Sequence, residues 1–89
     1  MTNEKAQEVA RDLIGWTATP ETIKQEINLH FKGFTGYEIH FMTGQANVEF
    51  KNGYHFGFGL TSNKDETIVK ITQAVALDPN DKIICNITN

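Results

Sequence analysis

The apolar positions in the first third of the chain recur at helical spacing. Between residues 4 and 14 they fall on one face, with charged side chains mainly opposite, which predicts an amphipathic helix. Thr19, Pro20 and Glu21 then follow in the order of a helix cap, a first-turn proline and an acidic residue at the positive end of the helix dipole. A second helix is therefore expected from residue 20 to about residue 32.

From Tyr37 onward the apolar period changes to two. Three stretches, at 37–42, 46–51 and 54–60, alternate between apolar and polar or glycine positions. Successive side chains of a strand point to opposite faces, so each stretch predicts a strand with one apolar face. The three strands are expected to form an antiparallel meander.

Parity predicts the turns between these strands, because a slip of one residue would move a whole apolar set to the other face. An even loop at Thr43 and Gly44 pairs the apolar sets of the first two strands, for example Ile39 with Val48. A two-residue turn at Asn52-Gly53 would mix the faces of the second hairpin. A three-residue loop over 51–53, with glycine in the left-handed bulge position, keeps them matched.

The segment from residue 63 to residue 77 returns to helical spacing. Ser62 or Asn63 can cap a helix there, with acidic residues in its first turn and a stripe formed by Ile68, Ile71, Thr72 and Val75. After a turn over 78–81, residues 82–88 alternate again, with Ile83, Cys85 and Ile87 on one side, and predict a last strand. If the helix crosses the sheet, this strand runs parallel to 54–60 and lies beside 54–60 or 37–43.

The expected fold is α+β, in the order α-α-β-β-β-α-β, with a three-stranded antiparallel meander, room for a fourth strand at 82–88, and helices packed on one face. A chain of 89 residues can bury one core, so we expect one domain over residues 1–89.

The charge pattern argues against nucleic acid as a partner. The formal net charge is -3, and the eight Lys and Arg residues are spread singly, so they form no basic stripe. The order α-β-β-β-α over residues 20–77 resembles the double-stranded RNA-binding domain, which implies a similar architecture and an RNA-binding alternative. That family opens its last helix with clustered lysines, whereas residues 63–67 are net acidic, so this activity is not expected.

The remaining composition predicts a cytoplasmic protein without a cofactor. No apolar run is long enough to span a membrane, and no segment near Met1 has the pattern of a signal peptide. Cys85 is a lone cysteine in an apolar alternation, as expected of a small core residue in a reducing compartment. No Ser, Cys or Thr has the sequence context of a catalytic nucleophile, so we do not expect an enzyme.

The register predicts one polar cluster on the face away from the apolar set. Glu38 lies opposite Glu49, Glu49 lies opposite His55, and His40 is diagonal to Glu49. Carboxylates and imidazoles can bind a divalent metal or share a proton, so a metal or small-ligand site is one interpretation. The other is that these residues form the solvated face of a one-sided sheet.

By elimination, the first hypothesis is a non-catalytic protein-interaction module. It would be a small acidic adaptor, regulator or inhibitor that covers part of a larger protein, of the kind that phage and plasmid accessory genes encode. The expected contact residues are those of the outer sheet face and the single Trp: His40, Met42, Glu49, His55, Gly57, Gly59 and Trp16. The sequence also leaves open a homodimer formed through a sheet edge.

Overall fold

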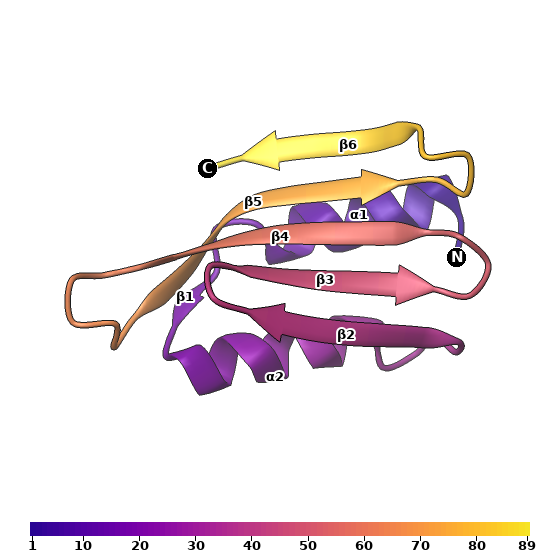
Figure 1. Cartoon of the computed structure of the whole chain (residues 1–89). Coiled ribbons are helices and arrows are strands. Elements are labelled where there is room, and N and C mark those ends of the chain that lie inside the picture. The colour runs from indigo at the N-terminus through magenta and orange to yellow at the C-terminus, as the bar shows by residue number, and fades with distance from the viewer.

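The computed structural model describes residues 1–89 and has two helices behind one antiparallel sheet (Figure 1). The elements are α1 (Asn3–Leu13), β1 (Thr17–Ala18), α2 (Pro20–Phe31), β2 (Tyr37–Met42), β3 (Gln45–Phe50), β4 (His55–Ser62), β5 (Val69–Leu77) and β6 (Ile83–Thr88). The sheet runs β2-β3-β4-β5, and both β1 and β6 pair with the far side of β5, at different ends of it. The fold is therefore α+β.

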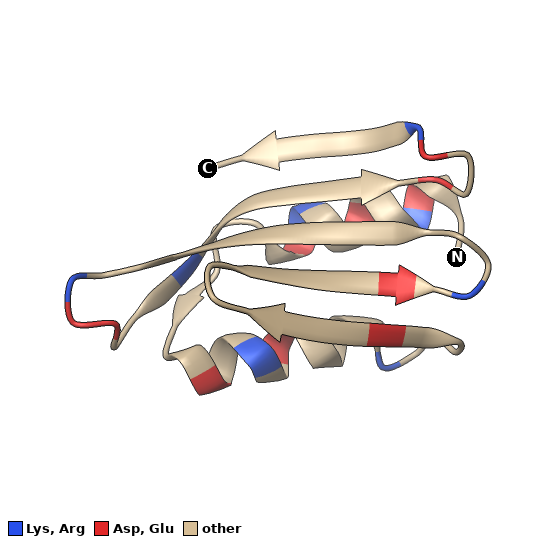
Figure 2. Ribbon diagram, in the orientation of Figure 1, with Lys and Arg blue, Asp and Glu red and all other residues tan.

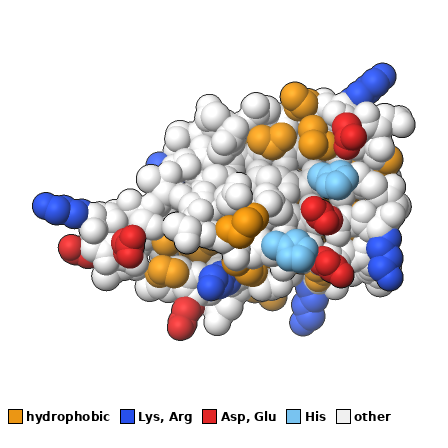
Figure 3. All heavy atoms as spheres, viewed as in Figure 1, with side chains coloured by type: hydrophobic (Ala, Val, Ile, Leu, Met, Phe, Trp, Pro, Cys, Tyr) orange, Lys and Arg blue, Asp and Glu red, His pale blue; other side chains and the backbone are white.

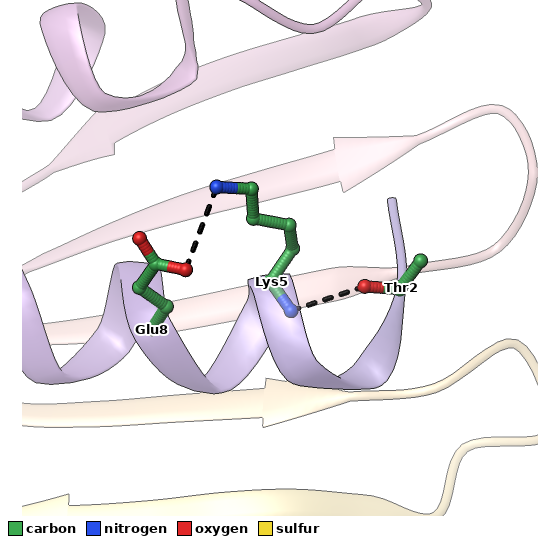
Figure 4. Close-up of polar contacts among 3 residues, drawn as sticks. All are labelled: Thr2, Lys5 and Glu8. Atoms are coloured by element: carbon green, nitrogen blue, oxygen red, sulfur yellow. Dashed lines mark hydrogen bonds and ion pairs between the residues drawn. The ribbon is translucent and has the colours of Figure 1, made fainter.

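Both helices begin after a threonine cap, and of these two caps only Thr19 was expected from the sequence. The Thr2 hydroxyl accepts the backbone N–H of Lys5 at 3.1 Å, and the Lys5 ammonium pairs with Glu8 at 3.4 Å on the exposed side of α1 (Figure 4). Such an exposed pair adds little stability, whereas the cap satisfies a backbone donor that the helix leaves free. The Thr19 hydroxyl caps α2 in the same way, at 3.3 Å from the N–H of Thr22. Neither helix is long and apolar enough to cross a membrane.

The predicted registers of the first two hairpins are confirmed. Ile39 pairs with Val48 between β2 and β3, and Val48 pairs with Phe56 between β3 and β4. The backbone N–H of Phe50 donates to the carbonyl of Tyr54 at 2.9 Å, so the loop closed by this bond has the three residues 51–53, and its last residue, Gly53, has a φ of 103°. A Cβ on Gly53 would also lie 3.0 Å from the Cβ of Pro79, so both the backbone angle and the space favour glycine there.

The predicted third helix is wrong: residues 69–77 form strand β5, and the chain before it turns back over 63–68. A register shift opposite Gly59 and Leu60 leaves one residue of β5, Thr72, without a direct partner in β4. Val69 and Ile71 therefore face the core before the shift, and Ala74 and Ala76 face it afterwards. The bulge interrupts the alternation of apolar and polar residues along the strand. The apolar residues of this segment then recur at spacings of three and four, as they would in a helix.

The place of the last strand also differs from the prediction. Because β5 is a strand and not a crossover helix, β6 returns antiparallel to β5 and lies at the sheet edge, beside neither β4 nor β2. A second register shift, between Ala76 and Leu77, moves Ile83 from the inner face to the outer face of the sheet. The side chain of Ile83 is 65% exposed there. The double-stranded RNA-binding domain has a helix where this chain has β5. The resemblance to that fold is therefore not maintained.

The core has an aromatic half beneath α2. Phe31 is fully buried, and its ring centroid lies 4.9 to 6.5 Å from five other aromatic rings. They belong to the loop after α2 and to strands β2, β3 and β4: Phe34, Tyr37, Phe50, Phe56 and Phe58. Offset and edge-on contacts of this kind add to the gain from burial, so Phe31 attaches α2 to three strands at once.

The other half of the core is built from small side chains beneath α1. Ala6 and Ala10 of α1 and Ala74 and Ala76 of β5 are all fully buried, and α1 packs on β5 and β6. Small residues at facing positions let the helix approach the strands closely. The sheet continues past the start of β3 as an arm, in which Thr61 and Ser62 of β4 pair with β5 alone and β5 pairs on its other side with the short strand β1 (Figure 1).

Cys85 pairs with Ala76 on the helix side of the sheet and is partly buried, as the alternation predicts. Burial raises the pKa of its thiol, against smaller opposing effects of a hydrogen bond with the Ala76 backbone and of the positive charge of Arg11. A raised pKa means that less of the reactive thiolate is present at a given pH.

Removing the Phe31 ring should destabilise the fold more than any other change in α2. Phe31→Ala leaves a cavity bordered by five rings and is expected to lower the free energy of unfolding by about 3 to 5 kcal/mol, measured by urea denaturation. Leu29→Ala, at an exposed position of the same helix, is the control and should change it by less than about 0.5 kcal/mol. A loss below about 1 kcal/mol for Phe31→Ala would contradict the central role of this ring.

The Cys85 thiol should react slowly in the native protein. At about pH 8 we expect Ellman's reagent to modify Cys85 at least about tenfold more slowly in buffer than in urea, because the folded state both shields the thiol and raises its pKa. As the pH is increased, the modification rate of the native protein should begin to rise at a higher pH than that of the unfolded chain. In a Cys85→Ser background, Asn86→Cys supplies an exposed cysteine one residue away and should react at nearly the unfolded rate; equal rates for Cys85 and this control would refute the expectation.

Candidate functional site

The face of the sheet opposite the helices is uncovered, and strand pairing arranges its side chains in rows. We call this surface the open face. Its first row runs from β2 to β6 through Glu38, Glu49, His55, Leu77 and Ile83, each of which is the pairing partner of the next. Paired residues point to the same side of a sheet, so one row brings acidic, imidazole and aliphatic side chains together across five strands.

The structure places the predicted polar residues where the register puts them. The pairs Glu38 with Glu49 and Glu49 with His55 are confirmed. In Figure 3, acidic and histidine side chains lie next to one another on this face, and hydrophobic side chains gather beside them. The four residues of the predicted cluster, Glu38, His40, Glu49 and His55, therefore share one surface.

The closest polar contact in the cluster runs along β2. His40 Nε2 lies 3.4 Å from Glu38 Oε2, and both side chains are more than half exposed. Nowhere in the chain do three or more His, Cys, Asp or Glu side chains gather closely enough to hold a metal ion. As they lie, these groups form one solvated pair and its neighbours, an arrangement suited to hydrogen bonding or ion pairing with a partner.

A hollow lies at the centre of the open face, where β4 has no side chains. Gly57 pairs with Asn47 and Val75, and Gly59 pairs with Gln45 and Gln73. The hollow has a volume of about 230 Å³ and is lined by residues of the β3 start, β4 and β5. This volume exceeds that of a single water molecule several-fold, so the hollow has room for a side chain.

The two glycines have different reasons for lacking a side chain. A Cβ on Gly59 would lie 3.0 Å from the Cβ of Gln73, so packing across the strands favours glycine there. A Cβ on Gly57 would meet only Asn47 Oδ1, at an ordinary 3.8 Å. The fold therefore has room for a side chain at Gly57, and its absence leaves the hollow open.

Met42 and Trp16 complete the predicted contact residues, but only Met42 lies on the open face. Met42 ends β2, is 46% exposed and accepts a hydrogen bond from the Gln45 amide at 3.6 Å. Trp16 lies instead with the helices: its indole N–H donates to the backbone carbonyl of Asp12 at 3.0 Å, which folds the ring back onto the last turn of α1. At 39% exposure it belongs to another surface.

Sequence reasoning missed the aliphatic part of the open face. Val75, Leu77 and Ile83 lie there, although the spacing assigned Val75 to a helix stripe and Ile83 to an inner strand face. Both errors come from the register shifts in β5 and β6. The available signal was that five of the six residues from Thr67 to Thr72 are β-branched, which favours a strand over a helix.

The charge on the open face is acidic. Lys70 is the only Lys or Arg within any strand, and it lies in the arm, whereas Glu38 and Glu49 lie near one end of β2 and β3 (Figure 2). The centre of the face is uncharged. A partner that covers it would meet carboxylates at one side, a hollow in the middle and aliphatic side chains on β5 and β6.

Comparison with protein-family models, with curated proteins and with solved structures yields no match for this chain.

Proposed function

We propose that this chain is a non-catalytic protein-interaction module that covers part of a larger protein with its open face. The observation that carries the proposal is the composition of that face, where aliphatic residues adjoin the polar row and a hollow. The exposed face of a one-sided sheet is normally polar throughout. Half-exposed Val75 and Leu77 and the strongly exposed Ile83 depart from that pattern.

Mixed apolar and polar surfaces are typical of contacts between proteins. Such interfaces combine a central apolar region, a polar rim and side chains that fit into pockets. Here the hollow at Gly57 would accept a side chain of the partner, the aliphatic residues would lose water on contact, and the Glu38–His40 pair would form part of the rim.

The solvated state of the charged groups supports a binding role over a catalytic one. None of the charged or polar side chains is buried, and the closest acid and imidazole are both open to solvent. General acid–base catalysis usually relies on groups that are buried in a cleft or held close to other charges. The net charge of -3 favours a partner with a neutral or basic surface, as for a small acidic adaptor, regulator or inhibitor.

The proposal predicts that filling the hollow weakens binding without harming the fold. Gly57→Val should keep or raise the melting temperature, because the site tolerates a Cβ and valine favours strands. The same change should weaken capture of the partner by about tenfold or more. The measurement is a pull-down from nuclease-treated lysate of the native host, read by mass spectrometry and followed by calorimetry with the purified partner.

A second variant tests the polar row, and a third serves as the control. His40, Glu49 and His55 changed together to Ala should also lose the partner. Glu4, Glu8 and Arg11 changed together to Ala remove the same number of polar side chains from the exposed side of α1 and should leave capture unchanged. A partner retained by both open-face variants, or a wild-type chain that captures no protein, would refute the proposed function.

A further inference from the structure

Strand β2 forms one end of the sheet and pairs only with β3. The backbone N–H of Lys51 donates to the carbonyl of Gly36 at 2.8 Å, which makes these two residues a hydrogen-bonded pair. Hydrogen-bonded and non-hydrogen-bonded pairs alternate along an antiparallel ladder. The N–H and C=O groups of Tyr37, Ile39 and Phe41 therefore point away from β3, along the free edge.

Helix α2 lies alongside this edge on the helix side of the sheet (Figure 1). A hollow of about 530 Å³ lies between them, lined among others by Leu29 of α2, by Lys32 directly after this helix and by Tyr37 of β2. A second hollow of about 250 Å³ involves Ile23 and Lys24 of α2 and Phe41 and Met42 of β2. We call the space along α2 and β2 the edge groove.

The edge groove has an apolar wall that the fold itself does not cover. Leu29 is 58% exposed although it lies on a helix that packs against the sheet. The side chains of Tyr37, Ile39 and Phe41 are half-buried on the same side. A strand added to β2 would hydrogen-bond to these three residues and place alternate side chains over Leu29.

We propose that the edge groove binds an extended segment of another protein, which adds to β2 as a further strand. The segment would carry apolar side chains at alternate positions and an acidic group near Lys32 or Lys24. Lys24 already lies over the Phe41 ring, 5.5 Å from its centroid, so its charge is held at the edge. This addition uses main-chain hydrogen bonds for affinity and the hollows beside α2 for specificity.

Two features favour β2 over the other sheet edge and a partner over a second copy. The edge at β6 has no comparable hollow, since none of the four in the structure is lined by α1 or β6. Two copies paired antiparallel through β2 would bring both α2 helices to the same side of the joined sheet, next to the same edge. A helix-free segment meets no such obstacle.

The edge groove lies on the helix side of the sheet, so the proposal goes beyond the role of the open face and stands without it. To test it, peptides that bind the full chain are selected from a random twelve-residue library displayed on phage. One selected peptide is then synthesised and its binding followed by amide hydrogen exchange in NMR. We expect selected peptides with alternating apolar residues and acidic flanks, and exchange at Ile39 and its neighbours Tyr37 and Phe41 slowed about tenfold or more on binding.

Two variants and a matched control separate strand addition from other modes of binding. Ile39→Pro removes an outward N–H, and Leu29→Lys adds charge to the exposed wall, so each should weaken the peptide by about tenfold or more. In β6, the bond from the Asn89 N–H to the Thr72 carbonyl, 2.9 Å, places the Asn86 N–H outward in the same way. Asn86→Pro is thus the matched control and should bind the peptide as the wild type does.

Several outcomes would overturn the proposal. One is a library from which no peptide binds; another is protection at Asn86 and Thr88 in place of the β2 amides. Unchanged affinity in Leu29→Lys, a variant that alters only an exposed side chain, would exclude the edge groove even if Ile39→Pro failed to fold. Concentration-dependent protection of the β2 amides without peptide would assign the edge to a second copy of the chain.

Discussion

The packing of Phe31 against five aromatic rings is the contact on which the rest of this structure depends. One side chain near the end of α2 meets residues from three strands, so the helix cannot shift without disturbing all of them. The ring sets how far α2 stands from β2, β3 and β4. It also requires that every large aromatic side chain of the meander point to one face, which leaves the opposite face without a cover.

Both proposed binding surfaces follow from this one-sided arrangement. The open face exists because both helices lie on the other side of the sheet. The edge groove exists because Phe31 holds α2 along β2, and Leu29 of α2 lines the hollow beside this edge strand. None of the other elements formed by these 89 residues covers either surface.

The polar half of the open face could be predicted from the sequence, and its apolar half could not. Glu38, Glu49 and His55 sit in strands with unbroken alternation, so parity alone assigned their face and their partners. Leu77 and Ile83 lie beyond register shifts, where one extra residue reverses the face of everything that follows. Nothing local at Thr72 or Ile84 marks such a shift, because it is stabilised by pairing with neighbouring strands.

The sequence by itself determined where the two helices begin to within about a residue, the three-residue loop at Gly53, and the registers of β2, β3 and β4. These features depend on side-chain period, caps and turn geometry, which act over a few residues. Only the tertiary structure decided that residues 69–77 extend between β4 and β6, that β6 lies at an edge, and that α2 flanks β2. In that segment the spacing suits either a helix or a bulged strand, and the choice depends on backbone hydrogen bonds to strands distant in the chain.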